Sequence, residues 1–207
     1  MASLFSLLFM TRSSPDPSPR AGLHPLVFSL AITLWLVALC NVALWRQLST
    51  LPEVAGLRGV LFGVGMACMI AGVIHTLLSL LSWRWTLKPV LTLFLLSAAA
   101  GAYFMLSYGI VIDPSMIENV TQTDPREAAD LLNWRMLLAL LVLAVLPAWW
   151  VWKTPAKRLT WGRQLLGNTL SLLLSIAVTV LSLIAIYQDF ASVMRNHTQV
   201  RYLINPL

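Results

Sequence analysis

Charged residues are scarce in this sequence. They make up 11% of its 207 residues, whereas a soluble domain carries about 25%. Hydrophobic residues make up 58%, and the mean hydropathy is +0.79. Such a chain has too few polar groups to cover the surface of a soluble globular domain, so its composition indicates an integral membrane protein.

Cysteine is almost absent, and the familiar catalytic motifs are missing. Cys40 and Cys68 both lie inside apolar runs, where a thiol behaves as a small hydrophobe. Their placement excludes a disulfide framework and a CxxC site. The sequence also has no GxSxG, HExxH or glycine-rich phosphate loop. His24, His75 and His197 lie in separate segments, which excludes a single histidine metal site in this chain.

The basic excess lacks the pattern typical of nucleic-acid binding. The formal net charge is +6, but the lysines and arginines lie in loops. No basic stripe alternates with exposed aromatic residues. We therefore predict membrane lipids, and no nucleic acid, as partners.

The first 25 residues differ from the rest of the chain. No positive charge precedes their short apolar stretch, so a secretory signal is not indicated. The proline-rich segment 13–19 favours an extended linker over a helix. We interpret residues 1–25 as a cytoplasmic tail.

Five apolar runs are long enough, or nearly so, to cross a bilayer core of about 30 Å, which needs roughly 20 helical residues. The fourth is the shortest, and its Pro147 predicts a kink or an early end. Tryptophans gather at the ends of the runs, as in the aromatic belt at headgroup level. We predict an all-α polytopic membrane protein with five transmembrane helices in a domain spanning 26–188, the runs being 26–45, 59–83, 89–112, 136–152 and 165–188.

Loop charges indicate the orientation of the spans. Basic residues are densest after the second and fourth runs, whereas the longer loop after the third run holds only Arg126 and Arg135. The positive-inside rule then places the N-terminus in the cytoplasm and the C-terminus outside.

Residues 113–135 form a polar loop between the third and fourth runs. The wider stretch 108–132 holds five of the eight carboxylates of the chain. Two N-cap-plus-proline signals begin at Asp113 and Asp124. Ser115 and Glu118 have capping-box spacing behind the first signal, and Glu127 follows Asp124 by three residues. We predict two short interfacial helices, at 114–122 and 125–133.

Three polar residues of this loop recur at a spacing of four. Asn119, Thr123 and Glu127 would lie near one line if the second helix continued the first. An amide, a hydroxyl and a carboxylate suit a lipid headgroup with an ammonium and a phosphate. The alternative interpretation is that these residues only cap and solvate two helices.

Small and polar residues inside the runs have structural explanations. An intramembrane ionisable group such as His75 raises the hypothesis of a functional site, but a neutral histidine bonded to a neighbouring helix is the favoured interpretation. The glycines of the second run and its approach favour close helix packing: Gly56, Gly59, Gly63, Gly65 and Gly72.

Residues 189–207 return to a polar composition. Asn205 followed by Pro206 is a helix start signal at the end of the sequence. We interpret 189–207 as the start of a linker to a domain that this chain does not contain.

Three motifs stand out: YGIVIDPSMIENVTQTDPREAADLL at 108–132, RWTLKP at 84–89, and DFAS at 189–192 followed by RNH at 195–197. Together they resemble the lipid A phosphoethanolamine transferases, the bacterial inner-membrane family that includes the transferable colistin-resistance enzymes. The resemblance runs from the first span to Leu207.

The resemblance implies five spans and a periplasmic zinc domain with a threonine nucleophile. Members move phosphoethanolamine from phosphatidylethanolamine onto lipid A, which weakens polymyxin binding. The resemblance implies that the phosphatidylethanolamine pocket includes Asn119, Thr123 and Glu127. It also implies that loop 113–135 and residues 189–207 are periplasmic. The zinc and the nucleophile would lie outside this chain. The chain alone is then expected to anchor the enzyme in the membrane and to help bind the donor lipid, without catalysing the transfer.

Two alternatives stay open. A self-contained small transporter or accessory membrane protein would need polar residues lining a path through the spans. A phosphoglycerol-transferring relative would keep the architecture and change the donor, although the acidic loop favours a donor that bears an ammonium.

Overall fold

The computed structural model describes residues 22–52, 56–109 and 133–206. Within these ranges the named elements are helices, and an isolated bridge joins Leu23 to Ala156. The all-α prediction is therefore confirmed. The helices are α1 (Pro25–Leu39), α2 (Val42–Ser49), α3 (Gly56–Leu81), α4 (Leu87–Tyr108), α7 (Trp134–Leu140), η2 (Leu141–Val145), α8 (Leu146–Lys153), α9 (Trp161–Asn196) and η3 (Thr198–Leu203).

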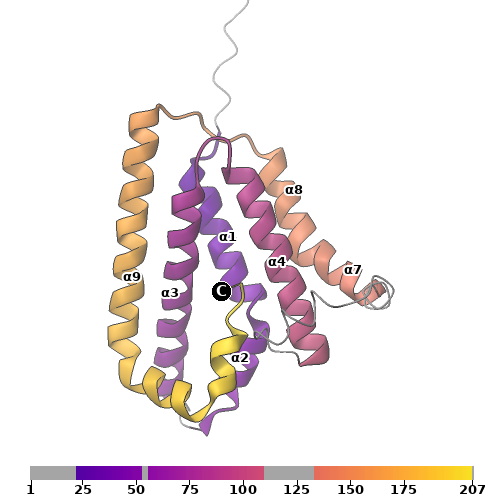
Figure 1. The fold of residues 1–207 in the computed structure, drawn as a ribbon, viewed down its shortest axis with the longest axis vertical. Coiled ribbons are helices and arrows are strands. Elements are labelled where there is room, and N and C mark those ends of the chain that lie inside the picture. The colour runs from indigo at the N-terminus through magenta and orange to yellow at the C-terminus, as the bar shows by residue number, and fades with distance from the viewer. Residues whose placement is uncertain (1–21, 53–55, 110–132, 207) are drawn as a thin grey trace, which may run out of the picture.

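Among the described residues, four helical stretches are long and apolar enough to span a membrane: α3, α4, Trp134–Lys153 and α9. The pair α1 and α2 makes a fifth if the two are one bent span. Figure 1 shows α1, α3 and α4 side by side, with α9 outside α3 and α8 outside α4. The core is made by apolar side chains that α1, α3 and α4 turn toward one another, among them Phe28, Leu36, Ile70, Leu91 and Leu95.

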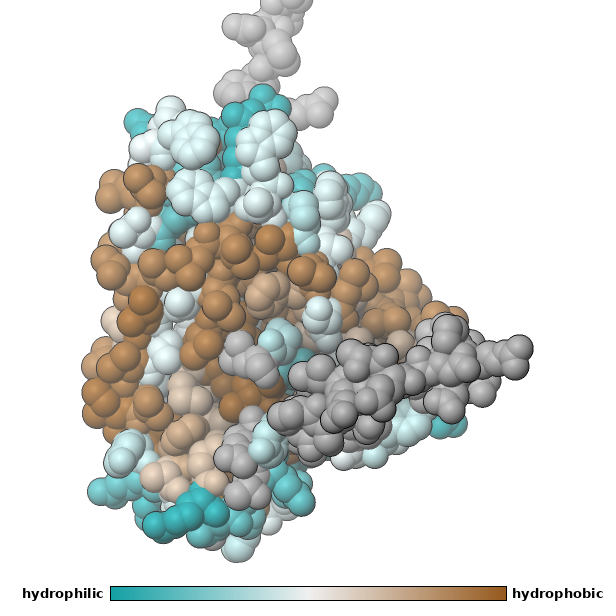
Figure 2. Space-filling model, in the orientation of Figure 1, coloured by the Kyte–Doolittle hydropathy of each residue, from teal (hydrophilic) through white to brown (hydrophobic). Residues whose placement is uncertain are grey.

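An apolar band surrounds the middle of the bundle. Figure 2 shows hydrophobic side chains across the middle of the visible face and hydrophilic ones at both ends. On α9, Leu170, Leu181 and Ile184 are exposed. Such a surface is suited to lipid, because water would not solvate it.

The first span is broken, contrary to the prediction of one run over 26–45. Helix α1 ends at Leu39, and α2 leaves it at an angle of 47°. Asn41 lies at the break with a non-helical backbone (φ −112°, ψ 24°), and its side-chain amide donates to Leu36 O at 3.0 Å. This side chain competes with the helical backbone ladder, which explains the bend.

The fourth span does not end early at Pro147. It runs on to Lys153 through the π-helical segment η2, in which the Leu146 N–H bonds Leu141 O. Proline lacks the N–H that would bond Leu143 O in an α-helix. The indole Nε1 of Trp35 on α1 donates to that carbonyl instead, at 3.0 Å, so the proline is accommodated within the span.

Helices α3 and α9 pack closely and antiparallel. A Cβ at Gly65 would clash with Ile186, and one at Gly72 would clash with Thr179 and Ser175. The packing role predicted for the glycines is therefore confirmed at these two positions. The predicted packing role is wrong for Gly63 and Gly56, where an added Cβ would meet nothing within 4 Å. Gly56 instead begins α3 with φ +67°.

Helix α9 continues past residue 188 to Asn196, and the chain then turns back through η3. Phe190 packs against the core, Val200 is buried, and Asn205 is 2% exposed. Figure 1 shows this final segment lying against α2. Residues 189–206 are thus folded onto the bundle, whatever follows them.

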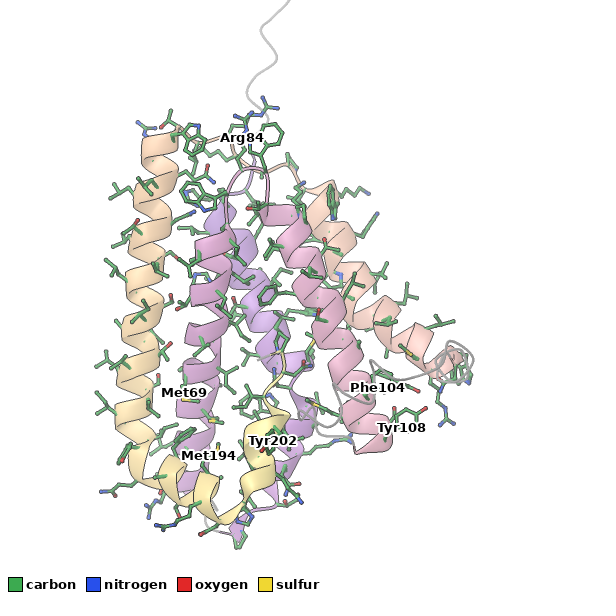
Figure 3. The ribbon with its side chains drawn as sticks, in the orientation of Figure 1. Met69, Arg84, Phe104, Tyr108, Met194 and Tyr202 are labelled. Atoms are coloured by element: carbon green, nitrogen blue, oxygen red, sulfur yellow. The ribbon has the colours of Figure 1, made fainter. Side chains whose placement is uncertain are left out.

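The bundle has two ends that differ in composition. We call the basic end residues 22–25, 82–88 and 153–164, which hold Arg84, Lys88, Lys153, Lys157, Arg158 and Arg163. We call the loop end α2 together with residues 103–109, 133–136 and 189–206. Figure 3 shows Arg84 at one end of the bundle and Phe104 and Tyr108 at the other.

Candidate functional site

The three predicted site residues, Asn119, Thr123 and Glu127, lie outside the described residues. So does most of the predicted pair of interfacial helices, 114–122 and 125–133. The last residue of that pair, Asn133, is described and is extended (φ −102°, ψ 164°), because it is the N-cap of α7. Near the predicted site, the structure therefore describes the residues on either side of loop 110–132, at the end of α4 and the start of α7.

Asn133 and Tyr103 connect these two points. The Asn133 amide Nδ2 donates to the Tyr103 hydroxyl at 2.8 Å, and that hydroxyl donates to Asn133 Oδ1 at 3.0 Å. The same Oδ1 accepts the Met136 N–H at 2.9 Å, which caps α7. The end of α4 and the start of α7 are therefore fastened together where the loop leaves and returns.

Three aromatic rings form a cluster at the end of α4. The ring centroids of Tyr103 and Phe104 are 5.6 Å apart, those of Tyr103 and Tyr108 6.1 Å, and those of Phe104 and Tyr108 5.9 Å. Gly109 then ends α4 in the left-handed conformation (φ 61°). Tyr108 is 46% exposed, so the cluster presents an exposed aromatic surface at the end of α4 (Figure 3).

Asn41 and Asn205 form a buried junction at the loop end that the sequence interpretation missed. The Asn41 amide donates to Asn205 O at 2.6 Å, and the Asn205 N–H donates to Asn41 Oδ1 at 2.8 Å. The Asn205 amide also donates to Cys40 O and Ala98 O, at 3.1 and 2.6 Å. Among described residues, the Asn205 side chain thus joins α1 and α4 instead of capping a helix. A lone amide in an apolar run, Asn41, was the available signal, but its partner lies far away in the sequence.

Arg58 and Asp189 join α3 and α9 near the same end. Arg58 Nη2 lies 2.5 Å from Asp189 Oδ1, and Arg58 Nε donates to Oδ2 at 3.2 Å. Two parallel bonds of this kind fix the relative position of a guanidinium and a carboxylate. Asp189, which opens the DFAS motif, therefore holds α9 where it emerges from the apolar band.

His75 is bonded to two neighbouring helices, as predicted. Its Nδ1 lies 3.3 Å from Thr33 Oγ1 on α1, and its Nε2 lies 2.9 Å from Ser171 Oγ on α9. Further along, Thr76 and Ser175 share a hydrogen bond of 2.8 Å. These polar groups are used in helix packing. All of them except Thr76 line a largely apolar cavity of about 390 Å³ between α1, α3 and α9.

Among the described residues, no group of three or more histidine, cysteine, aspartate or glutamate side chains could hold a metal ion. The zinc that the resemblance implies was assigned to a domain beyond this chain, and that assignment stays a prediction.

Comparison with known proteins identifies a family that the chain matches. Residues 70–207 match the family described as phosphoethanolamine transferase EptA/EptB. This range includes α4, loop 110–132, Asn133 and the Asn205 junction.

Individual relatives agree with the family match. The chain is 31% identical to phosphatidylethanolamine transferase Mcr-2 of Escherichia coli over 91% of its own length and 35% of the relative's. For phosphatidylethanolamine transferase Mcr-1 of Escherichia coli the identity is 32%, with the same coverage. It is 35% identical to phosphoethanolamine transferase EptA of Salmonella typhimurium over 90% of its length and 34% of the relative's. The chain thus spans about a third of the length of these relatives.

A solved structure has the same fold. It is the integral membrane protein lipooligosaccharide phosphoethanolamine transferase A (EptA) from Neisseria meningitidis, with a TM-score of 0.79 at 24% identity. The match covers 87% of this chain and 34% of that one.

Proposed function

Because the chain belongs to the EptA/EptB phosphoethanolamine transferase family, we propose that it is the membrane domain of an enzyme that moves phosphoethanolamine from phosphatidylethanolamine to lipid A. The observation that carries the proposal is the family match over residues 70–207, which takes in the polar loop and both residues that fasten it. In this proposal the transfer chemistry and its zinc belong to the part of the enzyme that this chain does not cover. The chain itself anchors that part and holds the donor.

The donor headgroup would bind at loop 110–132, through Asn119, Thr123 and Glu127. A carboxylate pairs with an ammonium, and an amide and a hydroxyl donate to phosphate oxygens. The Tyr103–Asn133 pair supports this assignment, because it fixes both ends of the loop on the bundle. Holding the donor phosphate in a fixed place accelerates transfer even without a chemical role, since orientation supplies several kcal/mol of rate.

The loop end would face the periplasm in the bacterial inner membrane. The basic end holds six lysines and arginines, in residues 84–88 and 153–163, and a dense cluster of this kind favours the cytoplasmic side. At the loop end Arg58 is paired with Asp189. Donor and acceptor lipids then meet in the outer leaflet, next to loop 110–132.

Cysteine labelling tests this orientation. With Cys40 and Cys68 replaced by serine, Ser107→Cys places a thiol at the loop end, and Lys157→Cys places one at the basic end; both positions are exposed. A membrane-impermeant maleimide given to cells with a permeabilised outer membrane should label only the Ser107→Cys protein. Labelling of the Lys157→Cys protein alone would show that the basic end faces the periplasm. Donor and acceptor lipids could then not meet at the loop end as proposed.

Glu127→Ala in the complete enzyme tests the donor site. We expect the variant to insert normally, to modify less lipid A and to give less polymyxin resistance, because the ammonium loses its partner. Glu118→Ala in the same loop is the matched control and should keep most of the activity. Unchanged resistance of the Glu127→Ala strain at normal expression would refute the assignment.

The two alternative functions have less support. The described polar side chains inside the bundle, such as His75 and Ser175, are bonded between helices, which is not the open path that a transporter requires. A phosphoglycerol donor would leave Glu127 without an ammonium to bind.

A further inference from the structure

Another cavity, lined by polar as well as apolar side chains, lies at the basic end, away from the residues that flank loop 110–132. Its volume is about 300 Å³. Its walls come from residues near the starts of α1, α4 and α9 and from the connection between α8 and α9. The polar and aromatic side chains that line it are Arg84, Trp85, Lys88, Lys157, Arg158 and Gln164.

Backbone contacts fix the walls of this cavity. The Leu23 N–H donates to Pro155 O at 3.0 Å, and the Lys157 N–H donates to Leu23 O at 2.9 Å. Gly22 passes so close that a Cβ there would lie 2.7 Å from the Lys157 nitrogen. The segment that bears Lys157 and Arg158 is therefore held against the start of α1.

The opposite wall is fixed by Lys88. Its ammonium donates to Trp152 O at 3.1 Å and to Thr154 O at 3.0 Å, which ties the start of α4 to the end of α8. Arg84 lies nearby, with its guanidinium 5.6 Å from the centroid of the Trp85 ring. The cavity thus has a positively charged residue pair on each side.

No carboxylate of the described residues balances these charges. The described part of the chain has one acidic residue, Asp189, and it lies at the loop end. Lys157 and Arg158 are both exposed. Helices α4 and α9 also begin at this end, and Thr160 makes no side-chain cap on α9, so their positive dipole ends add to the field. Four like charges around one cavity favour an anion between them.

The depth of the cavity identifies the anion as part of a lipid. Trp85 is 79% exposed and Trp161 is 77% exposed, and the Trp161 and Trp83 rings lie 5.9 Å apart. Exposed tryptophans mark the level of the headgroups, and Figure 2 shows the hydrophobic middle of the visible face giving way to hydrophilic side chains at each end. A phosphate in this cavity would therefore lie at headgroup depth.

We propose that this cavity binds the phosphate of an anionic phospholipid such as phosphatidylglycerol. The anionic lipid is favoured over phosphatidylethanolamine because the described residues of the cavity walls include no carboxylate that could pair with the ethanolamine ammonium. Basic pockets of this kind between membrane helices on the cytoplasmic side bind acidic headgroups in other proteins. In the orientation proposed above, this site lies in the leaflet opposite the donor site.

Lipid binding to the purified chain tests the proposal. The chain, delipidated in neutral detergent, is titrated with phosphatidylglycerol or with phosphatidylethanolamine of the same acyl chains, and bound lipid is counted by native mass spectrometry. We expect tighter binding of phosphatidylglycerol. The double variant Lys157→Gln, Arg158→Gln should weaken that binding about 25-fold, at about fivefold for each charge removed.

A matched variant separates the cavity from general surface charge. Lys153→Gln with Arg163→Gln removes two charges from the same end, outside the cavity, and should weaken binding less than fivefold. Arg84→Gln, from the opposite wall, is an independent variant expected to weaken binding about fivefold. Equal losses in the two double variants would overturn the cavity as the site.

Two further outcomes would also overturn the proposal. Equal affinity for the two lipids would remove the preference for an anionic headgroup. Displacement of phosphatidylglycerol by an equal concentration of soluble glycerol phosphate would show a free-phosphate site rather than a lipid site. Failure of glycerol phosphate to compete would support the lipid as the occupant.

Discussion

Tyr103 and Asn133 exchange two hydrogen bonds, of 2.8 and 3.0 Å, across the gap that loop 110–132 bridges. One residue is on the last turns of α4, and the other caps α7. The end of α4 and the start of α7, which flank the loop proposed to hold the donor lipid, are therefore fastened together and cannot separate without breaking this pair.

Asn133→Ala should destabilise the protein more than Tyr103→Phe does. The alanine removes the cap of α7, worth about 1 kcal/mol, as well as the pairing, whereas the phenylalanine removes the pairing and leaves the cap in place. Thermal unfolding of the purified chain in detergent would measure both. Equal shifts in Tm would show that the cap contributes nothing.

Gly72→Ala should destabilise the α3–α9 contact by about 1–3 kcal/mol, because the added methyl group meets Thr179 and the Ser175 carbonyl. Gly63→Ala is the matched control on the same helix. Open space surrounds Gly63, and alanine favours a helix, so this change should be neutral or stabilising. Unfolding in increasing denaturant distinguishes the two, and a tolerated Gly72→Ala would refute the close packing.

Asn205→Ala should cost about 1–3 kcal/mol, because it leaves the Cys40 and Ala98 carbonyls without their donor in a buried place. Asn41→Ala should have a comparable effect. The two changes remove different bonds, because Asn41 bonds the main chain of Asn205, which alanine keeps. Each set of bonds holds residue 205 in the place that the other set needs, so the double variant should lose less stability than the sum of the single losses. Strict additivity would mean that the junction is not a unit.

Trp35→Phe should destabilise the chain by about 0.5–1.5 kcal/mol, because Leu143 O loses the indole N–H. The effect should shrink when Pro147 is replaced by alanine, since the new backbone N–H can bond the same carbonyl. Unfolding of the single and double variants would show this coupling. An undiminished Trp35→Phe effect in the Pro147→Ala protein would contradict the explanation given for η2.

Much of the architecture was predictable because a bilayer imposes a simple rule: roughly 20 apolar residues make a span. That rule located the four long apolar helices and the bent pair of α1 and α2, and the bonding of His75 to its neighbours followed from the expense of an unpaired polar group in lipid. The break at Asn41 was not predictable in this way. Asn41 bonds Leu36 O and the main chain of the distant Asn205, and periodicity carries no information about such side-chain bonds.

The local exceptions were also invisible to the sequence pattern. Pro147 indicated a kink, but the rescue of Leu143 O depends on Trp35 being on the adjacent helix. The polar composition of 189–206 indicated a linker, although α9 continues to Asn196 and the segment folds back. The donor site, Asn119 to Glu127, lies outside the described residues and remains a prediction from sequence and family.

Photocrosslinking measures the donor site most directly. A phosphatidylethanolamine with a photoreactive group on its headgroup is irradiated with the complete enzyme in membranes, and the labelled peptide is found by mass spectrometry. The account predicts label within residues 113–135, and less of it after Glu127→Ala. Label confined to the basic end, at 84–88 or 153–164, with none in the loop, would contradict it.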